Sequence, residues 1–209
     1  ELCHGDWTAH SLNTAGDVDG DGLDDILVCA YRSNEAGYNA GKVFLVPGHR
    51  LGPEGGRLDL GDAPIQFLGE QAFDLLGHTV ASAGDVDADG LQDIVLGAYG
   101  SNDSTGKAYV VLGSSIEDEM TMDVGAADFI FEGEHSGDEA GYVTASAGDV
   151  DGDGLGDLLI VAFFNKEVGD GATPTGQSGS GKLYVVTAGE LPAPGGTVAL
   201  GDIDRAWLA

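Results

Sequence analysis

The sequence has few basic residues. Eight Lys and Arg stand against 36 Asp and Glu, which gives a net charge of −28 at pH 7. This charge repels nucleic-acid phosphates and anionic lipid surfaces, so we expect neither as a partner. Because 42% of the residues are hydrophobic and lie between the acids, the composition favours an ordered acidic protein over a disordered acidic tail.

Long apolar runs are also absent. The longest, residues 158–164, has the length of a buried strand, well below the roughly 20 residues of a membrane-spanning helix. We therefore expect no membrane insertion. The chain begins at Glu1 with no Met and no basic-then-apolar leader, which suggests a processed, secreted protein or a piece of a longer one.

Cysteine is scarce. Cys3 and Cys29 can form one disulfide or remain two thiols. We expect the Cys3–Cys29 disulfide, because the other sequence features point to an oxidising, extracellular location.

Catalytic motifs are missing as well. The sequence contains no GxSxG nucleophile elbow, no GxxxxGK phosphate loop and no HExxH zinc motif. We expect a protein that is not an enzyme. With so many acidic residues, a catalytic pair of carboxylates like that of a glycosidase stays open as an alternative. A non-catalytic part of a secreted enzyme is a remote alternative.

The sequence does contain a long internal repeat. A nine-residue motif reads DVDGDGLDD from residue 17, DVDADGLQD from residue 85 and DVDGDGLGD from residue 149. Each copy follows Thr-Ala-Gly or Ser-Ala-Gly and precedes an apolar, strand-like run. The repeat is therefore a whole supersecondary unit.

Each unit reads as four short strands and no helix. In the second copy, runs typical of strands cover 65–68, 79–83, 93–99 and 107–112. A four-stranded unit at this period is typical of a β-propeller blade. We expect an all-β fold of three tandem four-stranded antiparallel blades, as a partial or open propeller or a repeat array.

The repeat frame divides the chain into 1–60, 61–124, 125–200 and 201–209. In this frame the first blade lacks its leading strand and 201–209 is an orphan strand, with Trp207 and Leu208 as candidate assembly residues. Closure within one chain would be strained with three blades. Two arrangements stay open: head-to-tail strand complementation into a filament or ring, and a piece of a longer array.

The acidic motif predicts calcium binding. Carboxylates at alternate positions of a turn converge on one centre, Gly at position six permits the turn, and a backbone carbonyl adds an oxygen. An EF-hand would need Glu at position twelve, where this chain has Val28, Leu96 and Ile160. The eighth position, with three unrelated residues, is expected to face solvent. The candidate ligands of the three Ca²⁺ sites are the side chains of Asp17, Asp19, Asp21, Asp25, Asp85, Asp87, Asp89, Asp93, Asp149, Asp151, Asp153 and Asp157 and the carbonyls of Leu23, Leu91 and Leu155.

With these loops the sequence resembles the FG-GAP repeats of integrin alpha-subunit β-propellers and their bacterial relatives. The Phe-Gly dipeptide corresponds to Thr8-Ala9, Leu76-Gly77 and Ala140-Gly141, and Gly-Ala-Pro to residues 29–31, 97–99 and 161–163. The resemblance implies that calcium ions stabilise the blades.

We expect a calcium-stabilised extracellular structural or adhesion module that self-associates head-to-tail. The alternative is a module that recognises an extracellular protein or glycan through the variable loops 32–41, 100–106 and 165–181.

Overall fold

The structure is a computed structural model that describes residues 8–52, 58–165 and 181–203, and the backbone of the strand at 206–208. Its helical segments are 3-10 turns and one short turn, α1 (Ser101–Ser104), which contains left-handed residues. The 3-10 turns are Gly48–Arg50, Leu60–Asp62, Gly113–Ser115, Val124–Ala126, Ala188–Glu190 and Leu200–Asp202. The strands are β1 (Thr8–Gly16), β2 (Asp25–Ala30), β3 (Lys42–Val46), β4 (Ile65–Leu68), β5 (Val80–Gly84), β6 (Asp93–Ala98), β7 (Lys107–Val111), β8 (Met120–Asp123), β9 (Phe129–Glu132), β10 (Ala140–Gly148), β11 (Asp157–Ala162), β12 (Lys182–Val186), β13 (Gly196–Ala199) and β14 (Ala206–Leu208).

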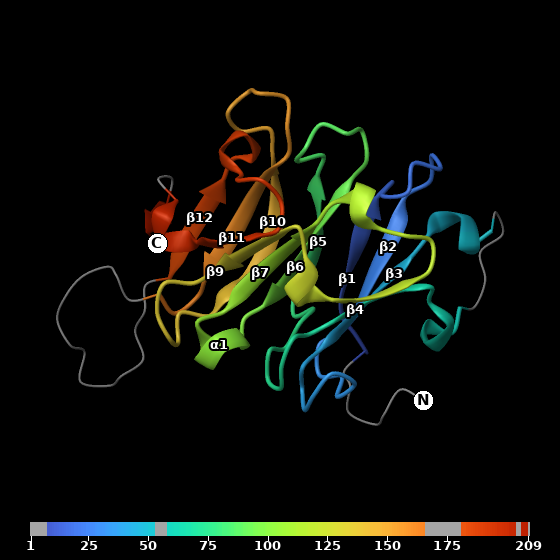
Figure 1. Ribbon diagram of the computed structural model, residues 1–209, viewed down its shortest axis with the longest axis horizontal. Helices are drawn as coiled ribbons and strands as arrows, with labels where there is room; N and C mark the ends of the chain where they lie inside the picture. Colours follow the sequence, from blue (N-terminus) through green and yellow to red (C-terminus); the bar gives the residue numbers. More distant parts are fainter. Residues whose placement is uncertain (1–7, 53–57, 166–180, 204–205, 209) are drawn as a thin grey trace.

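Across the described ranges the strands form three sheets that follow one another along the molecule (Figure 1). Each sheet contains four antiparallel strands in chain order: β1-β2-β3-β4 in the first sheet, β5-β6-β7-β9 in the second and β10-β11-β12-β14 in the third. The all-β fold of propeller-blade type that the sequence predicts is confirmed.

Two of the sheets receive a fifth strand from the next unit along the chain. β8 lies between β7 and β9 in the sequence but pairs in parallel with β4 of the first sheet. In the same way β13 lies between β12 and β14 and pairs in parallel with β9 of the second sheet. The second and third units therefore each contribute backbone hydrogen bonds to the preceding sheet, which ties consecutive sheets together.

The strand pairing corrects the expected repeat frame. The segment Ile65–Leu68 was expected to begin a second blade, but it pairs with β3 as the fourth strand of the first sheet. The strand Ala206–Leu208 pairs with β12 of its own chain, Leu183 lying opposite Trp207, and so it is not an orphan. A repeat period gives the length of a unit but not the strand at which its sheet begins. The expected pairing of residues 201–209 with another copy of the chain rested on an unpaired strand, and it is therefore no longer supported.

Apolar side chains between the sheets form the core. A strand alternates its side chains between two faces, so the middle sheet can bury one face against each neighbour. Accordingly every residue of β6 is buried. The first and second sheets meet through Leu27, Val43, Leu45, Phe67, Ile94, Leu96, Tyr109 and Val111. The second and third sheets meet through Val95, Val110, Phe129, Phe131, Leu158, Ile160, Tyr184 and Val186.

No helix among the described residues is long and apolar enough to cross a membrane.

Candidate calcium sites

The three acidic loops occupy equivalent places in the three sheets. They join β1 to β2, β5 to β6 and β10 to β11, and they lie in a row along one edge of the molecule (Figure 1). The ninth residue of each loop, Asp25, Asp93 or Asp157, is the first residue of the following strand. The last candidate ligand of each loop is therefore fixed at the start of a strand that packs in the sheet.

The backbone of each loop turns through left-handed residues at positions four and six. In the first loop these are Gly20 and Gly22, with φ of 76° and 88°. The turn directs their N–H groups at the first carboxylate: Asp17 Oδ1 accepts from Gly20 at 2.8 Å and Oδ2 from Gly22 at 3.0 Å. The third loop repeats both bonds at Asp149.

The second loop lacks one of these bonds. Its position four is Ala88, which has φ of 64°. Asp85 Oδ2 accepts from Gly90 at 3.0 Å, but Asp85 Oδ1 is buried and has no hydrogen-bond partner among the described residues. A buried carboxylate oxygen without a partner is costly, and a bound cation would satisfy it.

The ninth aspartate of each loop links that loop to the segment that follows the third strand of the same sheet. Asp93 Oδ2 accepts from Val86 N at 2.6 Å, and Asp93 Oδ1 accepts from Gly113 N at 2.8 Å. The other two sheets make the same pairs of bonds, from Val18 and Gly48 to Asp25 and from Val150 and Ala188 to Asp157. Each ninth aspartate is fully buried. The loop is therefore pinned in place by its last candidate ligand.

Burial and the concentration of acids raise the pKa values of several loop carboxyls. Burial raises the pKa of Asp93 to about 7; two backbone hydrogen bonds oppose the shift, and the charges of Asp87 and Asp89 add to it. Burial also raises the pKa values of Asp25 and Asp87, with a further contribution from neighbouring carboxylates. A cation among these groups would relieve both penalties.

The loops bring three of their four candidate side-chain ligands together. Carboxylate oxygens from positions one, three and nine lie within 4.8 Å of one another in Asp17, Asp19 and Asp25, in Asp85, Asp87 and Asp93, and in Asp149, Asp151 and Asp157. The fifth-position aspartates accept hydrogen bonds from the backbone N–H groups of position seven, at 2.7 Å for Asp21 and Leu23, 2.8 Å for Asp89 and Leu91 and 2.9 Å for Asp153 and Leu155. Ligation by the fifth aspartates and by the leucine carbonyls stays a prediction.

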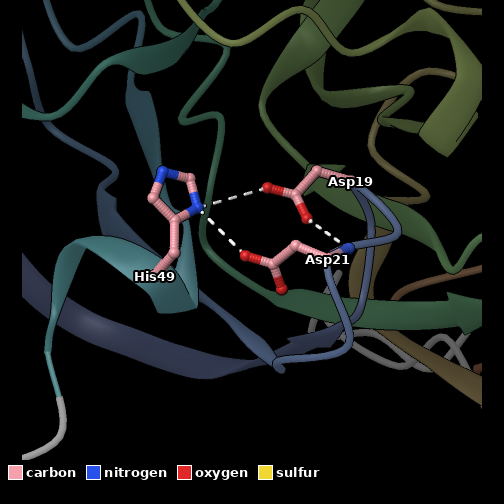
Figure 2. A group of neighbouring side chains, drawn as sticks. All are labelled: Asp19, Asp21 and His49. Atoms are coloured by element: carbon pink, nitrogen blue, oxygen red, sulfur yellow. Dashed lines mark hydrogen bonds and ion pairs between the residues drawn. The ribbon is translucent and has the colours of Figure 1, made fainter.

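The first loop has a neighbour that the sequence does not predict. Figure 2 shows His49 beside it, with Nδ1 at 3.1 Å from Asp21 Oδ2 and 3.6 Å from Asp19 Oδ2. The imidazole is half exposed. His49 comes from the 3-10 turn after β3, at a position occupied by Ser114 and Gly189 in the other units. No local pattern predicts this contact, because only the sheet brings the two segments together.

These residues fit a hard divalent cation. Each loop offers converging carboxylate oxygens, which suit Ca²⁺ and, less well, Mg²⁺. The buried Asp85 Oδ1, which has no hydrogen-bond partner among the described residues, is an oxygen that such a cation would satisfy.

The geometry agrees with comparisons to known proteins. The FG-GAP repeat profile matches residues 11–46 and 76–111, and each matched segment contains one acidic loop. The chain belongs to the FG-GAP repeat family. It is 28% identical over 176 residues to integrin alpha pat-2 of Caenorhabditis briggsae, which covers 77% of this chain and 14% of that protein. It is 32% identical over 168 residues to human integrin alpha-IIb, which covers 78% of this chain and 15% of that protein. The chain thus spans only a small part of these relatives.

The glycine of the FG dipeptide has a structural explanation in this chain. Gly77 and Gly141 have φ of 86° and 77°. A β-carbon on Gly141 would lie 2.1 Å from the carbonyl oxygen of Lys107, and one on Gly77 would lie 2.9 Å from Cβ of Cys29. These FG-GAP positions therefore exclude a side chain for reasons of both conformation and space.

The remaining predicted residues of the FG-GAP units have different outcomes. Cys29 is buried, and its Sγ accepts a hydrogen bond from Ser11 N at 2.9 Å. Cys3 lies outside the described residues, so the Cys3–Cys29 disulfide stays a prediction. The side chains of Trp207 and Leu208 also lie outside the description, and the loop 165–181 lies almost wholly outside it.

Aromatic rings form a row across the three repeat units. His10 contacts Tyr31, His78 contacts Tyr99 and Tyr142 contacts Phe163, with centroids 4.6 to 5.0 Å apart. His78 also contacts His10 and Tyr142 in the adjacent units. His10, His78 and Tyr142 occupy one repeat position, and these contacts give that position a packing role.

Proposed function

We propose that this chain is a calcium-stabilised, non-enzymatic FG-GAP module that works outside the cell in adhesion. The observation that carries the proposal is the convergence of three carboxylates in each of the three acidic loops. A bound Ca²⁺ would supply positive charge at each convergence point. Integrin alpha relatives support the adhesion setting.

Calcium would act on stability because the loops are assembled only in the folded chain. Each ninth aspartate must be pinned at a strand mouth by two backbone N–H groups before it can face the first and third aspartates. A ligand that binds only the folded form stabilises it by RT ln(1 + [L]/Kd). With a Kd of about 0.1 mM, about 10 mM Ca²⁺ contributes roughly 2.7 kcal/mol per site.

An extracellular setting suits a calcium affinity of this order. Loops of this affinity would be filled at millimolar calcium and empty at the low concentrations of a cell interior. The net charge of −28 adds to the dependence, because the unfilled loops concentrate negative charge at one edge of the molecule.

Urea unfolding followed by circular dichroism tests the proposal. We expect the unfolding midpoint to rise with added Ca²⁺ and to fall on chelation. A triple variant, Asp19→Asn, Asp87→Asn and Asp151→Asn, should lose most of this response because each change removes one converging carboxylate.

A control variant matches the charge change. Asp62→Asn, Glu117→Gln and Asp118→Asn remove three exposed acids outside the loops, and this variant should keep the calcium response. Equal responses in the two variants would show that calcium acts through general screening. If the unfolding midpoint of the unmodified protein did not change with calcium concentration, the proposal would be overturned.

A second function, recognition of a protein or glycan, is favoured by an exposed aromatic pair. Tyr38, in the loop 32–41, and Phe73 are 63% and 58% exposed, and their rings lie 5.3 Å apart, edge to face. Phe73 has φ of 71°, and the third unit has Gly137 at the same position. A bulky residue in this conformation is strained, and strain beside an exposed apolar pair is typical of a binding surface.

Phe73→Gly separates binding from folding. The variant should be more stable than the parent and should lose binding on a protein or glycan array. Val143→Ser, which changes another exposed apolar residue, is the control and should keep binding. Unaltered binding by Phe73→Gly would exclude the aromatic pair as the binding surface.

A further inference from the structure

Neighbouring acidic loops are hydrogen-bonded to each other through their backbones. The N–H of Gln92 donates to the carbonyl of Asp17 at 3.0 Å, and the N–H of Gly156 donates to the carbonyl of Asp85 at 2.8 Å. In both junctions the acceptor is the first residue of one loop and the donor is the eighth residue of the next. The loops therefore form a continuous chain across the three sheets.

Both junctions are tightly packed. A β-carbon on Gly16 would lie 2.6 Å from Cγ of Gln92, and one on Gly156 would lie 2.7 Å from the carbonyl oxygen of Ala83. The eighth position was expected to face solvent, but Gln92 and Gly156 are only partly exposed. The expectation fails there because the neighbouring loop covers this position, a contact that the repeat sequence does not reveal.

The junction residues belong to the candidate ligand sets. Asp17 and Asp85 offer side-chain carboxylates to their own loops while their carbonyls hold the next loop. On the donor side, Gln92 and Gly156 immediately precede the buried ligand candidates Asp93 and Asp157. Ordering of one ligand set therefore restrains a peptide group beside a ligand of the next set.

We propose that the three loops bind calcium cooperatively, each filled loop raising the affinity of its neighbours. This inference rests on the calcium binding proposed above. Cooperativity arises because the conformational entropy lost in ordering a junction is lost once and then benefits both loops. The coupling is reciprocal, so filling the third loop must favour the second as much as the second favours the third.

The second loop should depend most on this coupling. It has a junction on each side, to Asp17 in the first loop and from Gly156 in the third. It also has the left-handed Ala88 and the unpaired Asp85 Oδ1, so its ligand set is the least organised by its own hydrogen bonds.

The test measures calcium binding at each loop separately. Amide resonances of Gly22, Gly90 and Gly154 report the three loops during a calcium titration, with and without Asp151→Asn in the third loop. We expect this change to weaken calcium binding at Gly90 about tenfold, within the usual range of coupling between sites. The titration is done in about 1 M KCl, where the Debye length is about 3 Å and direct charge effects between loops are screened.

A second variant breaks the junction and leaves every aspartate in place. Gly156→Ala places a methyl group against the Ala83 carbonyl, and its backbone does not need a left-handed conformation. In this background Asp151→Asn should no longer change the affinity reported by Gly90. The control is Gly196→Ala, which adds a methyl group in open space and should keep the coupling.

The outcomes separate the inference from the proposed function. An affinity at Gly90 that is unaffected by Asp151→Asn would overturn cooperativity and leave calcium binding intact. No calcium-dependent shift at any of the three glycines would overturn calcium binding itself. If Gly156→Ala does not fold, the comparison of the parent with Asp151→Asn still decides the question.

Discussion

Ala88 occupies a backbone conformation that glycine occupies in the other two loops. Its φ is 64°, against 76° for Gly20 and 83° for Gly152. A residue with a β-carbon is strained in this region, and relief of such strain is worth on the order of 1 kcal/mol. We therefore predict that Ala88→Gly raises the free energy of unfolding by about 1 kcal/mol, measured by urea denaturation.

The third loop supplies the converse experiment. A β-carbon on Gly152 would meet no atom within 4 Å, so Gly152→Ala adds backbone strain and no clash. We predict a loss of about 1 kcal/mol for this variant under the same conditions. If both variants moved stability in the same direction, the left-handed conformation would not be the cause.

At the scale of elements, a glutamate after one sheet is bound by the third strand of the next. Glu70 follows β4 and accepts hydrogen bonds from Lys107 Nζ at 2.8 Å and from Tyr109 OH at 2.6 Å, both on β7. Glu134 follows β9 and makes the same contacts with Lys182 and Tyr184 on β12. In the first sheet, the corresponding residues are Lys42, which pairs with Glu35, and Phe44. The contact therefore marks a junction between two sheets.

Removing one hydroxyl group from this junction should weaken it measurably. Hydrogen bonds to charged groups contribute roughly 1.5–3 kcal/mol, and Glu70 keeps some contact with solvent. We predict that Tyr109→Phe lowers the free energy of unfolding by about 1.5 kcal/mol. Tyr38→Phe, which changes an exposed ring, should have no effect; a similar loss there would mean that the assay does not report the junction.

The same junction predicts an acid-sensitive contribution to stability. Burial alone would raise the pKa of Glu70, but hydrogen bonds from Lys107 and Tyr109 and the Lys107 charge outweigh it, so the pKa lies below 4.5. The carboxylate therefore stabilises the folded state above its unfolded pKa, and this contribution is lost as pH falls through the lowered folded-state value. Urea midpoints between about pH 7 and pH 3 should converge for the parent and Glu70→Gln at the acid end. A difference in urea midpoint that does not change with pH would instead mean that Glu70→Gln acts through packing.

Local sequence patterns predicted the strands and the loops but not how units meet. The runs expected at 65–68 and 107–112 correspond to β4 and β7, because apolar alternation and flanking turn residues are local signals. The parallel pairing of β8 with β4 was not predicted, because the four residues Met120–Asp123 contain no information about a distant partner. His49 was missed for the same reason. The backbone hydrogen bonds between neighbouring loops were not predicted either, because they join peptide groups, which every residue has.

At the scale of the whole molecule, the sheets form a linear series with open ends. Leu27 in β2 faces the second sheet and is fully buried. Leu159 in β11 is the same residue at the same repeat position, but no fourth sheet lies beyond it among the described residues, and it is only partly buried. Identical residues in identical strands thus have different environments because of their place in the series.

This difference predicts unequal effects of one substitution. Leu27→Ala leaves a cavity between two sheets and should cost about 2–5 kcal/mol, whereas Leu159→Ala removes a partly exposed side chain and should cost about 1 kcal/mol or less. Urea unfolding of both variants at the same calcium concentration gives the comparison. Equal losses would mean that the outer face of the third sheet is covered in solution. In that case the cost of Leu159→Ala should fall on dilution if the cover is a second copy of the chain, and should stay constant if it is another part of the same chain.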